Sequence, residues 1–298
     1  MKYLVKHIYE KDYGCEGRPE GEKPKVEVVL CADNAADAEG DVIIEAEDAW
    51  MYAHGIKEGD IWPSEYPTVL SINYKAVRDE VDKACRRAGR DPQEVTLIAV
   101  SKTKPIEALE EAYEAGARDY GENKVQEMVD KIPQMPSDIR WHMIGHLQRN
   151  KVKYIVGKTE LIHSVDSLKL AQEIDRLSQA AGVVTDILLE VNAAHEESKF
   201  GLAPEEVIPQ AREIAKFPGV RIRGLMTVAP DVDDPEENRP VFVQMRKLLE
   251  ELRDEQIPGV EAAFLSMGMT GDYRVAVEEG ATHVRVGTGI FGARNYAI

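Results

Sequence analysis

The chain has 298 residues, and 43% of them are apolar, which suits one or two globular domains with a sizeable core. Asp and Glu number 54 against 37 Lys and Arg, so the formal net charge is -17. This charge argues against a nucleic acid or an anionic membrane as the main partner, because both would repel the chain. The apolar runs are far shorter than the ~20 residues of a membrane-spanning helix, and we expect a cytoplasmic protein.

The cysteines and histidines show no spacing typical of a metal site. Cys15, Cys31 and Cys85 are widely separated and form no CxxC pair, and the seven histidines include no HExxH motif. We therefore expect neither a disulfide framework nor a protein-held metal. Cys85 lies in a helical pattern and is expected to be a small core residue.

The first 66 residues differ from the rest of the chain. They carry a net charge of -9, whereas the remaining 232 residues carry -8. Strand-like patterns at 3–9, 25–32 and 41–46 are followed by a short amphipathic helix that ends near Gly55, with Trp50 and Trp62 as expected packing anchors. We predict a small α+β or β-rich module over 1–66, joined by a proline-flanked linker at 63–67 to a domain over 67–298.

From residue 71 onward, helical and strand-like patterns alternate. A helix is predicted at 72–88, beside the last element of the domain. Eight apolar runs then follow, separated by segments with helical periodicity: 95–100, 117–122, 140–145, 160–165, 185–191, 220–228, 262–269 and 283–292. Eight strand and helix repeats over about 230 residues predict a (β/α)8 TIM barrel, an α/β fold, although an open doubly wound sheet gives a similar pattern.

In such a barrel the functional residues lie at the carboxyl ends of the strands. Lys102 directly follows the first predicted strand. A lysine in that place is either a surface residue or an amine whose pKa is lowered by apolar walls, as Schiff-base chemistry requires.

The last two predicted strands end in loops that suit a phosphate group. The first loop contains Ser266 and Gly268, and the second contains Gly287 and Thr288. Small residues let backbone N–H groups approach a phosphate, and the loops after strands seven and eight often bind one in this fold. Arg285 lies two residues before Gly287, and strand alternation points it toward the barrel mouth, where its alternative role is an ion pair.

Three further residues have alternative roles that the sequence leaves open. Asn123 follows the second strand and either contacts a ligand or caps the next helix. His142 and His146 lie four residues apart at the end of the third strand. Because no third ligand is nearby, packed or hydrogen-bonded histidines are favoured over a metal site.

Seven motifs then occur in a characteristic order: AVSKTKP, GENKVQE, WHMIGHLQRNK, ESKFGL, GLMTVAP, LSMGMTGDY and RVGTGIFGAR. In this order and spacing the chain resembles the YggS/PROSC family of pyridoxal 5′-phosphate (PLP) homeostasis proteins from about Ser71 to Ile298. The family is similar to the N-terminal barrel domain of alanine racemase. This similarity agrees with the strand count obtained from the periodicity.

The resemblance implies a role for each matching position. Lys102 would carry PLP as an internal aldimine, Asn123 would touch the cofactor, and Met226 would lie near its ring. Arg285 would face the pyridine nitrogen, while Ser266, Gly287 and Thr288 would hold the phosphate together with the loop at Gly268. A guanidinium keeps that nitrogen unprotonated, which weakens the ring as an electron sink.

The resemblance therefore implies a PLP-binding protein that stores, buffers or delivers the cofactor and maintains vitamin B6 and amino-acid homeostasis without robust catalysis. Its partners would be PLP and PLP-dependent apo-enzymes, and we expect a monomer. The alternative is a single-domain PLP-dependent amino-acid racemase, in which Tyr273 or a water molecule would serve as the second base. Residues 1–66 have no counterpart in the family, and we expect them to form an interaction or regulatory module.

Overall fold

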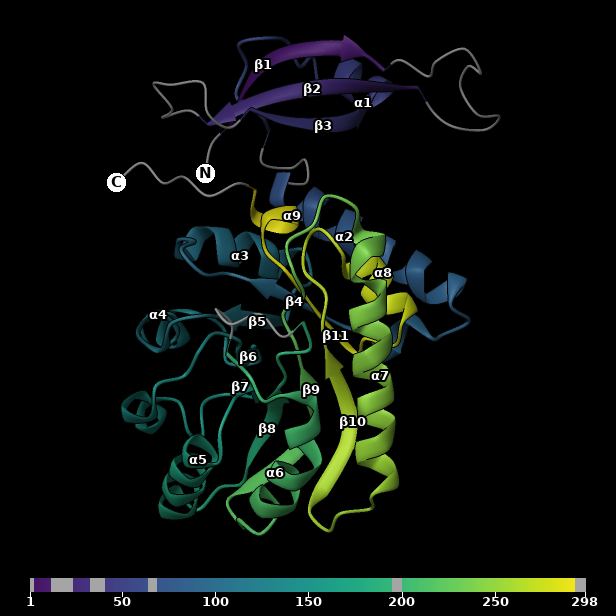
Figure 1. Ribbon diagram of the computed structural model, residues 1–298. Coiled ribbons are helices and arrows are strands. Elements are labelled where there is room, and N and C mark those ends of the chain that lie inside the picture. Colours follow the sequence, from purple (N-terminus) through teal and green to yellow (C-terminus); the bar gives the residue numbers. More distant parts are fainter. Residues whose placement is uncertain (1–2, 12–23, 33–40, 64–68, 195–199, 293–298) are drawn as a thin grey trace.

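The computed structural model describes residues 3–11, 24–32, 41–63, 69–194 and 200–292. Within these residues the chain forms a three-stranded antiparallel sheet and a closed eight-stranded barrel (Figure 1). The predicted (β/α)8 barrel with an N-terminal α+β module is thus confirmed. The expected linker at 63–67 falls almost wholly outside the described residues.

The N-terminal sheet has the strand order β1-β2-β3, and a short helix follows it. The strands are β1 (Tyr3–Glu10), β2 (Lys25–Ala32) and β3 (Val42–Glu47), and the helix is α1 (Asp48–Ala53). Apolar side chains on one face of the sheet pack against Met51 of α1 and against Trp62. Trp50 lies beside this core, which confirms both tryptophans as packing anchors.

The barrel strands follow one another around the barrel in chain order, as right-handed crossover connections require. They are β4 (Thr96–Val100), β5 (Asp119–Glu122), β6 (Arg140–Met143), β7 (Leu161–Val165), β8 (Thr185–Glu190), β9 (Val220–Met226), β10 (Val260–Ser266) and β11 (His283–Val286). Each lies in one of the eight predicted runs or overlaps it. The last run was predicted to continue to residue 292, but β11 ends at Val286 because the chain turns into a short helix.

Helices cover the outside of the barrel. They are α2 (Val69–Arg87), α3 (Ile106–Glu114), α4 (Val125–Lys131), α5 (Leu168–Ala181), α6 (Val207–Ile214), α7 (Arg239–Asp254), α8 (Tyr273–Glu278) and α9 (Thr288–Phe291), with 3-10 turns η2 (Pro92–Glu94), η3 (Ile132–Gln134), η4 (Arg149–Tyr154), η5 (Pro204–Glu206) and η6 (Pro235–Asn238). Between β6 and β7 the chain forms only the 3-10 turn η4. As predicted, α2 packs beside the last element: Asn73 donates a hydrogen bond to the Ile290 carbonyl at 3.3 Å.

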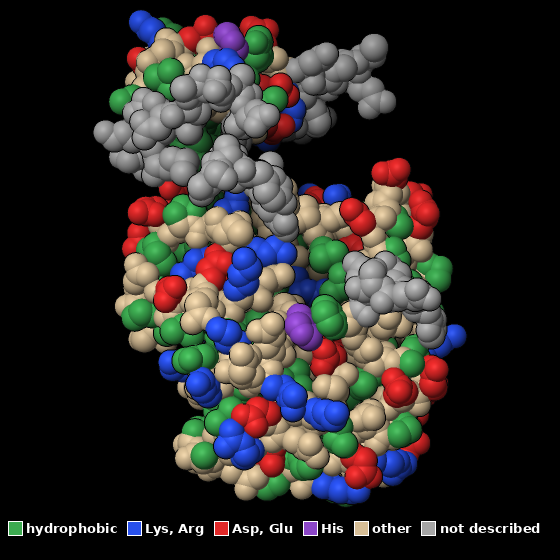
Figure 2. Space-filling view, turned by 60° about the vertical axis from the view of Figure 1, so that its left-hand side comes forward, with side chains coloured by type: hydrophobic (Ala, Val, Ile, Leu, Met, Phe, Trp, Pro, Cys, Tyr) green, Lys and Arg blue, Asp and Glu red, His purple; other side chains and the backbone are tan. Residues whose placement is uncertain are grey.

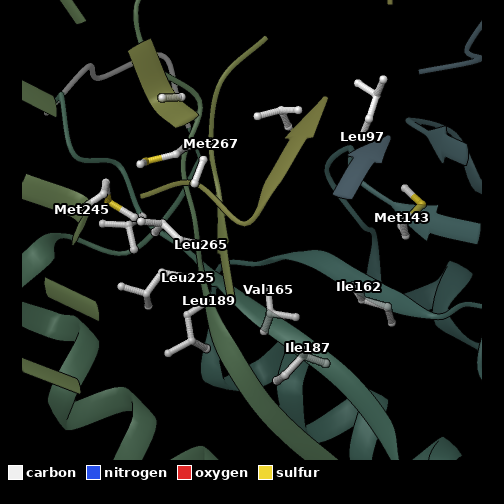
Figure 3. Close-up of a cluster of buried hydrophobic side chains, with 14 of the residues drawn as sticks. Leu97, Met143, Ile162, Val165, Ile187, Leu189, Leu225, Met245, Leu265 and Met267 are labelled. Atoms are coloured by element: carbon white, nitrogen blue, oxygen red, sulfur yellow. The ribbon is translucent and has the colours of Figure 1, made fainter. Parts of the chain in front are cut away.

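The main hydrophobic core lies between the strands and these helices. Figure 3 shows Leu189, Leu225 and Leu265, from three neighbouring strands, with Met245 of α7 beside them. Cys85 of α2 is fully buried in the same core, as predicted. Alternate strand residues supply this layer, which leaves the other set of side chains to fill the barrel interior.

The barrel interior is unusually polar. Barrels of this kind are commonly filled by branched apolar side chains. Here the amino-terminal ends of the strands carry ion pairs, with Arg140 bonded to Asp119 and Arg221 to Asp186. Above them lie three buried histidines, His142, His163 and His283. The interior is therefore a site for hydrogen bonds as well as for packing.

The N-terminal sheet lies beyond the carboxyl ends of the barrel strands, near α2 and α9 (Figure 1). Val69, at the start of α2, belongs to the core of the N-terminal module. The boundary at residues 66 and 67 stays a prediction. On the face shown in Figure 2, acidic and basic side chains are interspersed, so the acidic excess does not form one continuous patch there. Among the described helices, none combines the length and the apolar character needed to cross a membrane.

Candidate cofactor site

Lys102 lies in the turn that follows β4, at the carboxyl end of the barrel, where its side chain is partly buried. The next residue, Thr103, has φ +63°, a backbone conformation that is strained for a β-branched residue. The backbone N–H of Thr103 donates a hydrogen bond to Glu127 of α4 at 2.5 Å. This contact stabilises the turn and thereby sets where the Lys102 side chain begins.

A buried charged network lies directly under this turn. Lys131 of α4 donates to the Ser101 carbonyl at 2.8 Å, to Glu122 at 2.8 Å and to Glu127 at 2.7 Å. The hydroxyl of Ser101 also donates to Glu122 at 2.7 Å. Burial raises the pKa of Glu122, although the contacts with Lys131 and Ser101 oppose that shift. The sequence alone does not reveal this network, because nothing in the spacing of Glu122 and Lys131 indicates that both are buried.

Asn123 lies just past the end of β5, with its side chain partly buried. It does not cap the following helix, because the N-cap position of α4 is Lys124 and no side chain caps it. The backbone of Asn123 packs closely against Gly145, where a Cβ atom would lie 2.5 Å from the Asn123 carbonyl oxygen. Gly145 is thus required for this approach, and its carbonyl is held by the Ser164 hydroxyl at 2.6 Å.

Arg285 lies inside the barrel near the carboxyl end of β11 and is only 5% exposed. Its Nη1 donates to the Ser266 hydroxyl at 2.6 Å, and its Nη2 donates to the Thr227 carbonyl at 2.8 Å. No carboxylate among the described residues lies within ion-pair distance of it. Burial lowers the pKa of Arg285 to about 10, so it still carries its charge at neutral pH. The predicted alternative, an ion pair, is not what the described residues show.

The Ser266 hydroxyl links Arg285 to the buried histidines. It lies 2.9 Å from Nδ1 of His163, whose Nε2 lies 3.0 Å from Nδ1 of His142. Nε2 of His142 in turn lies 3.1 Å from the carboxylate of Asp119. Burial, together with the neighbouring histidines and Arg285, lowers the pKa of His163 well below its usual value. His142 is therefore hydrogen-bonded, the role that the sequence favoured over metal binding.

The phosphate loops predicted after β10 and β11 lie next to each other. The backbone N–H of Gly289 is 3.4 Å from the Thr270 hydroxyl, which connects the two loops. Gly268 has φ +91°, and a Cβ there would lie 2.6 Å from the side chain of Ala276, so only glycine fits. Gly287 and Thr288 form the start of α9. The phosphate contact expected of Ser266 stays a prediction, since its hydroxyl is bonded here to Arg285 and His163.

Two more residues face the interior at this end of the barrel. Met226, at the end of β9, is buried against Leu161 and Leu188. Glu190, at the end of β8, is 9% exposed, and its Oε2 has no hydrogen-bond partner among the described residues. Burial and the nearby Asp166 raise the pKa of Glu190 to about 7, with Arg285 opposing the shift. The sequence analysis passed over Glu190 because a glutamate at a strand end is usually solvated.

The side chains of Tyr273 and His146 lie outside the interior of the barrel. Tyr273, the second base named in the racemase alternative, is buried in the outer core, and the charged groups around it include Glu80 and Lys83 of α2. His146 stacks on Phe200 with ring centroids 3.8 Å apart, and it lies 3.3 Å from Asp166. The structure thus removes Tyr273 from the group of residues that can act at the barrel mouth.

Comparison with known proteins agrees with this geometry. Residues 72–295 match the family model of the alanine racemase N-terminal domain. The chain is 45% identical over 221 residues to the pyridoxal phosphate homeostasis protein of Aquifex aeolicus, covering 74% of this chain and 96% of the relative. It is 38% identical over 232 residues to the protein of the same name from Escherichia coli, covering 76% and 98%.

A solved structure of a protein with PLP bound is also similar to this chain. The structure of PipY of Synechococcus elongatus with PLP bound has 38% sequence identity and a TM-score of 0.62, and the match covers 72% of this chain and all of PipY. In each of these comparisons the matched part of the relative is nearly its whole length. The barrel of this chain therefore belongs to the pyridoxal phosphate homeostasis protein family, within the alanine racemase N-terminal domain family.

Proposed function

We propose that this protein binds PLP at the carboxyl end of its barrel and holds it as a store or carrier rather than as the coenzyme of a catalysed reaction. The observation that carries the proposal is Arg285, a buried guanidinium with no carboxylate partner among the described residues. Asp272 and Glu190 act on this charge only from beyond ion-pair distance, and a buried charge held in this way is costly unless a ligand or dipoles compensate it. Family membership identifies PLP as the ligand that fits.

The residues at this end of the barrel suit the aldehyde, the ring and the phosphate of the cofactor. When bound, PLP supplies an electron-withdrawing ring and an aldehyde that bonds covalently to a lysine amine. Lys102 would supply that amine. Arg285 would face the ring nitrogen, with Asn123 and Met226 as further contacts to the cofactor. Gly268, Gly287 and Thr288 would hold the phosphate, because loops after the last two strands of this fold offer backbone N–H groups to such groups.

Arg285 also favours storage over turnover. A guanidinium cannot give a proton to the ring nitrogen at neutral pH, so the ring would remain a weak acceptor of electrons. Racemisation by two bases needs a second acid or base opposite the lysine, and Tyr273 packs in the outer core instead. The relatives are named homeostasis proteins, which supports the same conclusion.

The first test is a comparison of two lysines that are two residues apart. We expect the purified protein with added PLP to form an adduct that borohydride reduction fixes on Lys102, as mapped by peptide mass spectrometry. Lys102→Ala should lose this adduct. Lys104→Ala is the matched control, because Lys104 already donates to the Phe291 carbonyl at 2.9 Å and should not carry the cofactor. A reducible adduct that persists in Lys102→Ala would contradict the assignment.

The second test separates a carrier from a racemase. We expect the PLP-loaded protein to leave the α-proton of L-alanine and other amino acids unexchanged in deuterium oxide, as followed by proton NMR. Exchange at a rate that depends on Lys102 would instead support the racemase alternative. Delivery of PLP to apo-enzymes, a monomeric state and a cytoplasmic location stay predictions of the same proposal.

A further inference from the structure

A continuous line of hydrogen-bonded side chains crosses the inside of the barrel. It consists of Asp119 on β5, His142 on β6, His163 on β7, Ser266 on β10 and Arg285 on β11, with successive donor–acceptor distances of 3.1, 3.0, 2.9 and 2.6 Å. We name these five residues the barrel relay. Because β7 and β10 are not neighbours in the barrel, the contact of His163 with Ser266 passes through the interior. The relay thus joins the opposite ends of the barrel.

All five side chains are buried, so bulk solvent has little access to these bonds. Ser266 and His163 have no exposed surface, His142 is 2% exposed, Arg285 5% and Asp119 8%. A buried polar group that loses its partner is not compensated by solvent. Each member therefore depends on the next for its hydrogen bond.

The groups at the two ends of the relay determine which atom donates and which accepts in each of its hydrogen bonds. Arg285 only donates, so the oxygen of Ser266 accepts from it. At the other end, hydrogen bonds from His142 and Arg140 outweigh burial and lower the pKa of Asp119, so this carboxylate accepts. With one proton on each ring, only one arrangement satisfies every bond: Ser266 donates to Nδ1 of His163, Nε2 of His163 donates to Nδ1 of His142, and Nε2 of His142 donates to Asp119.

We propose that the barrel relay is a positioning device for Arg285, in which His163, His142 and Asp119 orient the Ser266 hydroxyl so that its oxygen faces the guanidinium. With the Thr227 carbonyl as the second acceptor, two fixed oxygens then define the plane of the guanidinium. This inference rests on the proposed function, because its consequence is the placement of Arg285 against the ring nitrogen of PLP. His142, His163 and Asp119 are positioning residues that lie behind the cofactor site.

The decisive experiment compares two histidines of the same buried cluster. His163→Leu removes the link between Ser266 and His142. His163→Gln keeps one acceptor and one donor and should restore it. His283→Leu is the matched control, because His283 packs against His142 and Phe264 at ring distances of 6.1 and 4.8 Å but bonds to Thr282 instead of the relay. The measurements are the dissociation constant of PLP and the absorbance maximum of the protein-bound cofactor.

We expect His163→Leu to weaken PLP binding about tenfold, which corresponds to the loss of one positioned hydrogen bond, and to shift the absorbance maximum. His163→Gln and His283→Leu should stay within about threefold of the unsubstituted protein. Equal effects of His163→Leu and His283→Leu, or no effect of either, would overturn the inference while leaving PLP binding intact. Failure of the unsubstituted protein to bind PLP would instead refute the proposed function.

A second measurement needs neither cofactor nor substitution. Two-bond proton–nitrogen NMR spectra of the imidazole rings report which nitrogen carries the proton. We expect the proton of each hydrogen-bonded ring on Nε2, in His142 as in His163. A proton on Nδ1 of either ring would reverse the direction of the relay and overturn the inference, and this outcome remains measurable if His163→Leu does not fold.

Discussion

Glu190 is a carboxyl group that the barrel buries. It lies at the end of β8, is nearly fully buried, and one of its carboxylate oxygens has no hydrogen-bond partner among the described residues. Its raised pKa of about 7 means that the folded state holds a proton that the unfolded chain releases near pH 4.5. The free energy of unfolding should therefore fall as the pH rises from about 4.5 to about 7, and then level off.

Replacement of Glu190 should remove this dependence. In the cofactor-free protein, Glu190→Gln should raise the free energy of unfolding at pH 8 by up to about 3 kcal/mol, because a shift of one pKa unit corresponds to ~1.4 kcal/mol. At pH 4.5 it should change little. Urea unfolding between pH 4.5 and 8 measures the effect, with the exposed Glu205→Gln as the control. A difference between wild type and Glu190→Gln that does not vary with pH would contradict this account.

At the scale of elements, helix α4 shapes the cofactor end of the barrel through one lysine. Lys131, in the last turn of α4, reaches under the turn after β4 and bonds to the Ser101 carbonyl, Glu122 and Glu127. Glu127 in turn accepts from the strained Thr103 backbone. Helix and turn are thus coupled, and the place of Lys102 depends on a buried lysine of another element.

Removal of the Lys131 charge should destabilise both helix α4 and the turn after β4. We expect Lys131→Met to lower the free energy of unfolding by about 3 kcal/mol, because it leaves Glu122 buried without its cation. It should also weaken PLP binding, since the turn that carries Lys102 loses its support. The exposed Lys124→Met, at the start of the same helix, should cost less than about 0.5 kcal/mol. Chemical denaturation and PLP titration of the two variants test the prediction, and equal stabilities would refute it.

At the scale of the whole molecule, the N-terminal module and the barrel have separate cores. One hydrophobic cluster holds the sheet β1-β2-β3 together with α1, and another lies between the barrel strands and their helices. The two meet at α2, whose Val69 and Ile72 pack into the module, while its later residues pack on the barrel. The matched relatives consist almost wholly of the barrel part.

We therefore expect residues 67–298 to fold without the module. The shortened chain should keep a cooperative thermal transition and its PLP binding, and it should lose about 2 kcal/mol of stability, the order expected from exposing one or two apolar side chains. Circular dichroism and PLP titration provide the measurements. A chain that aggregates, or that melts without a cooperative transition, would show that module and barrel are one folding unit.

The sequence by itself determined the number and order of the strands and helices, because the hydrophobic pattern depends on which face of each element is buried, whereas closure of the barrel was left open against a doubly wound sheet. It predicted the three N-terminal strands, all eight barrel strands and the packing of Cys85. It also located Lys102, Asn123, Gly268, Arg285 and Gly287 near the carboxyl ends of strands, since each lies at or just after the end of an apolar run. The last run was predicted to reach residue 292, whereas β11 ends at Val286.

Only the tertiary structure decided which polar residues are buried together. His142, His163 and Ser266 lie on strands that are far apart in the chain, and closure of the barrel brings them into contact. The burial of Glu190 and the pairing of Glu122 with Lys131 likewise depend on neighbours from other elements. Hydrophobic periodicity is a local property of the chain, whereas a buried hydrogen bond or ion pair needs two partners whose separation only the closed barrel sets.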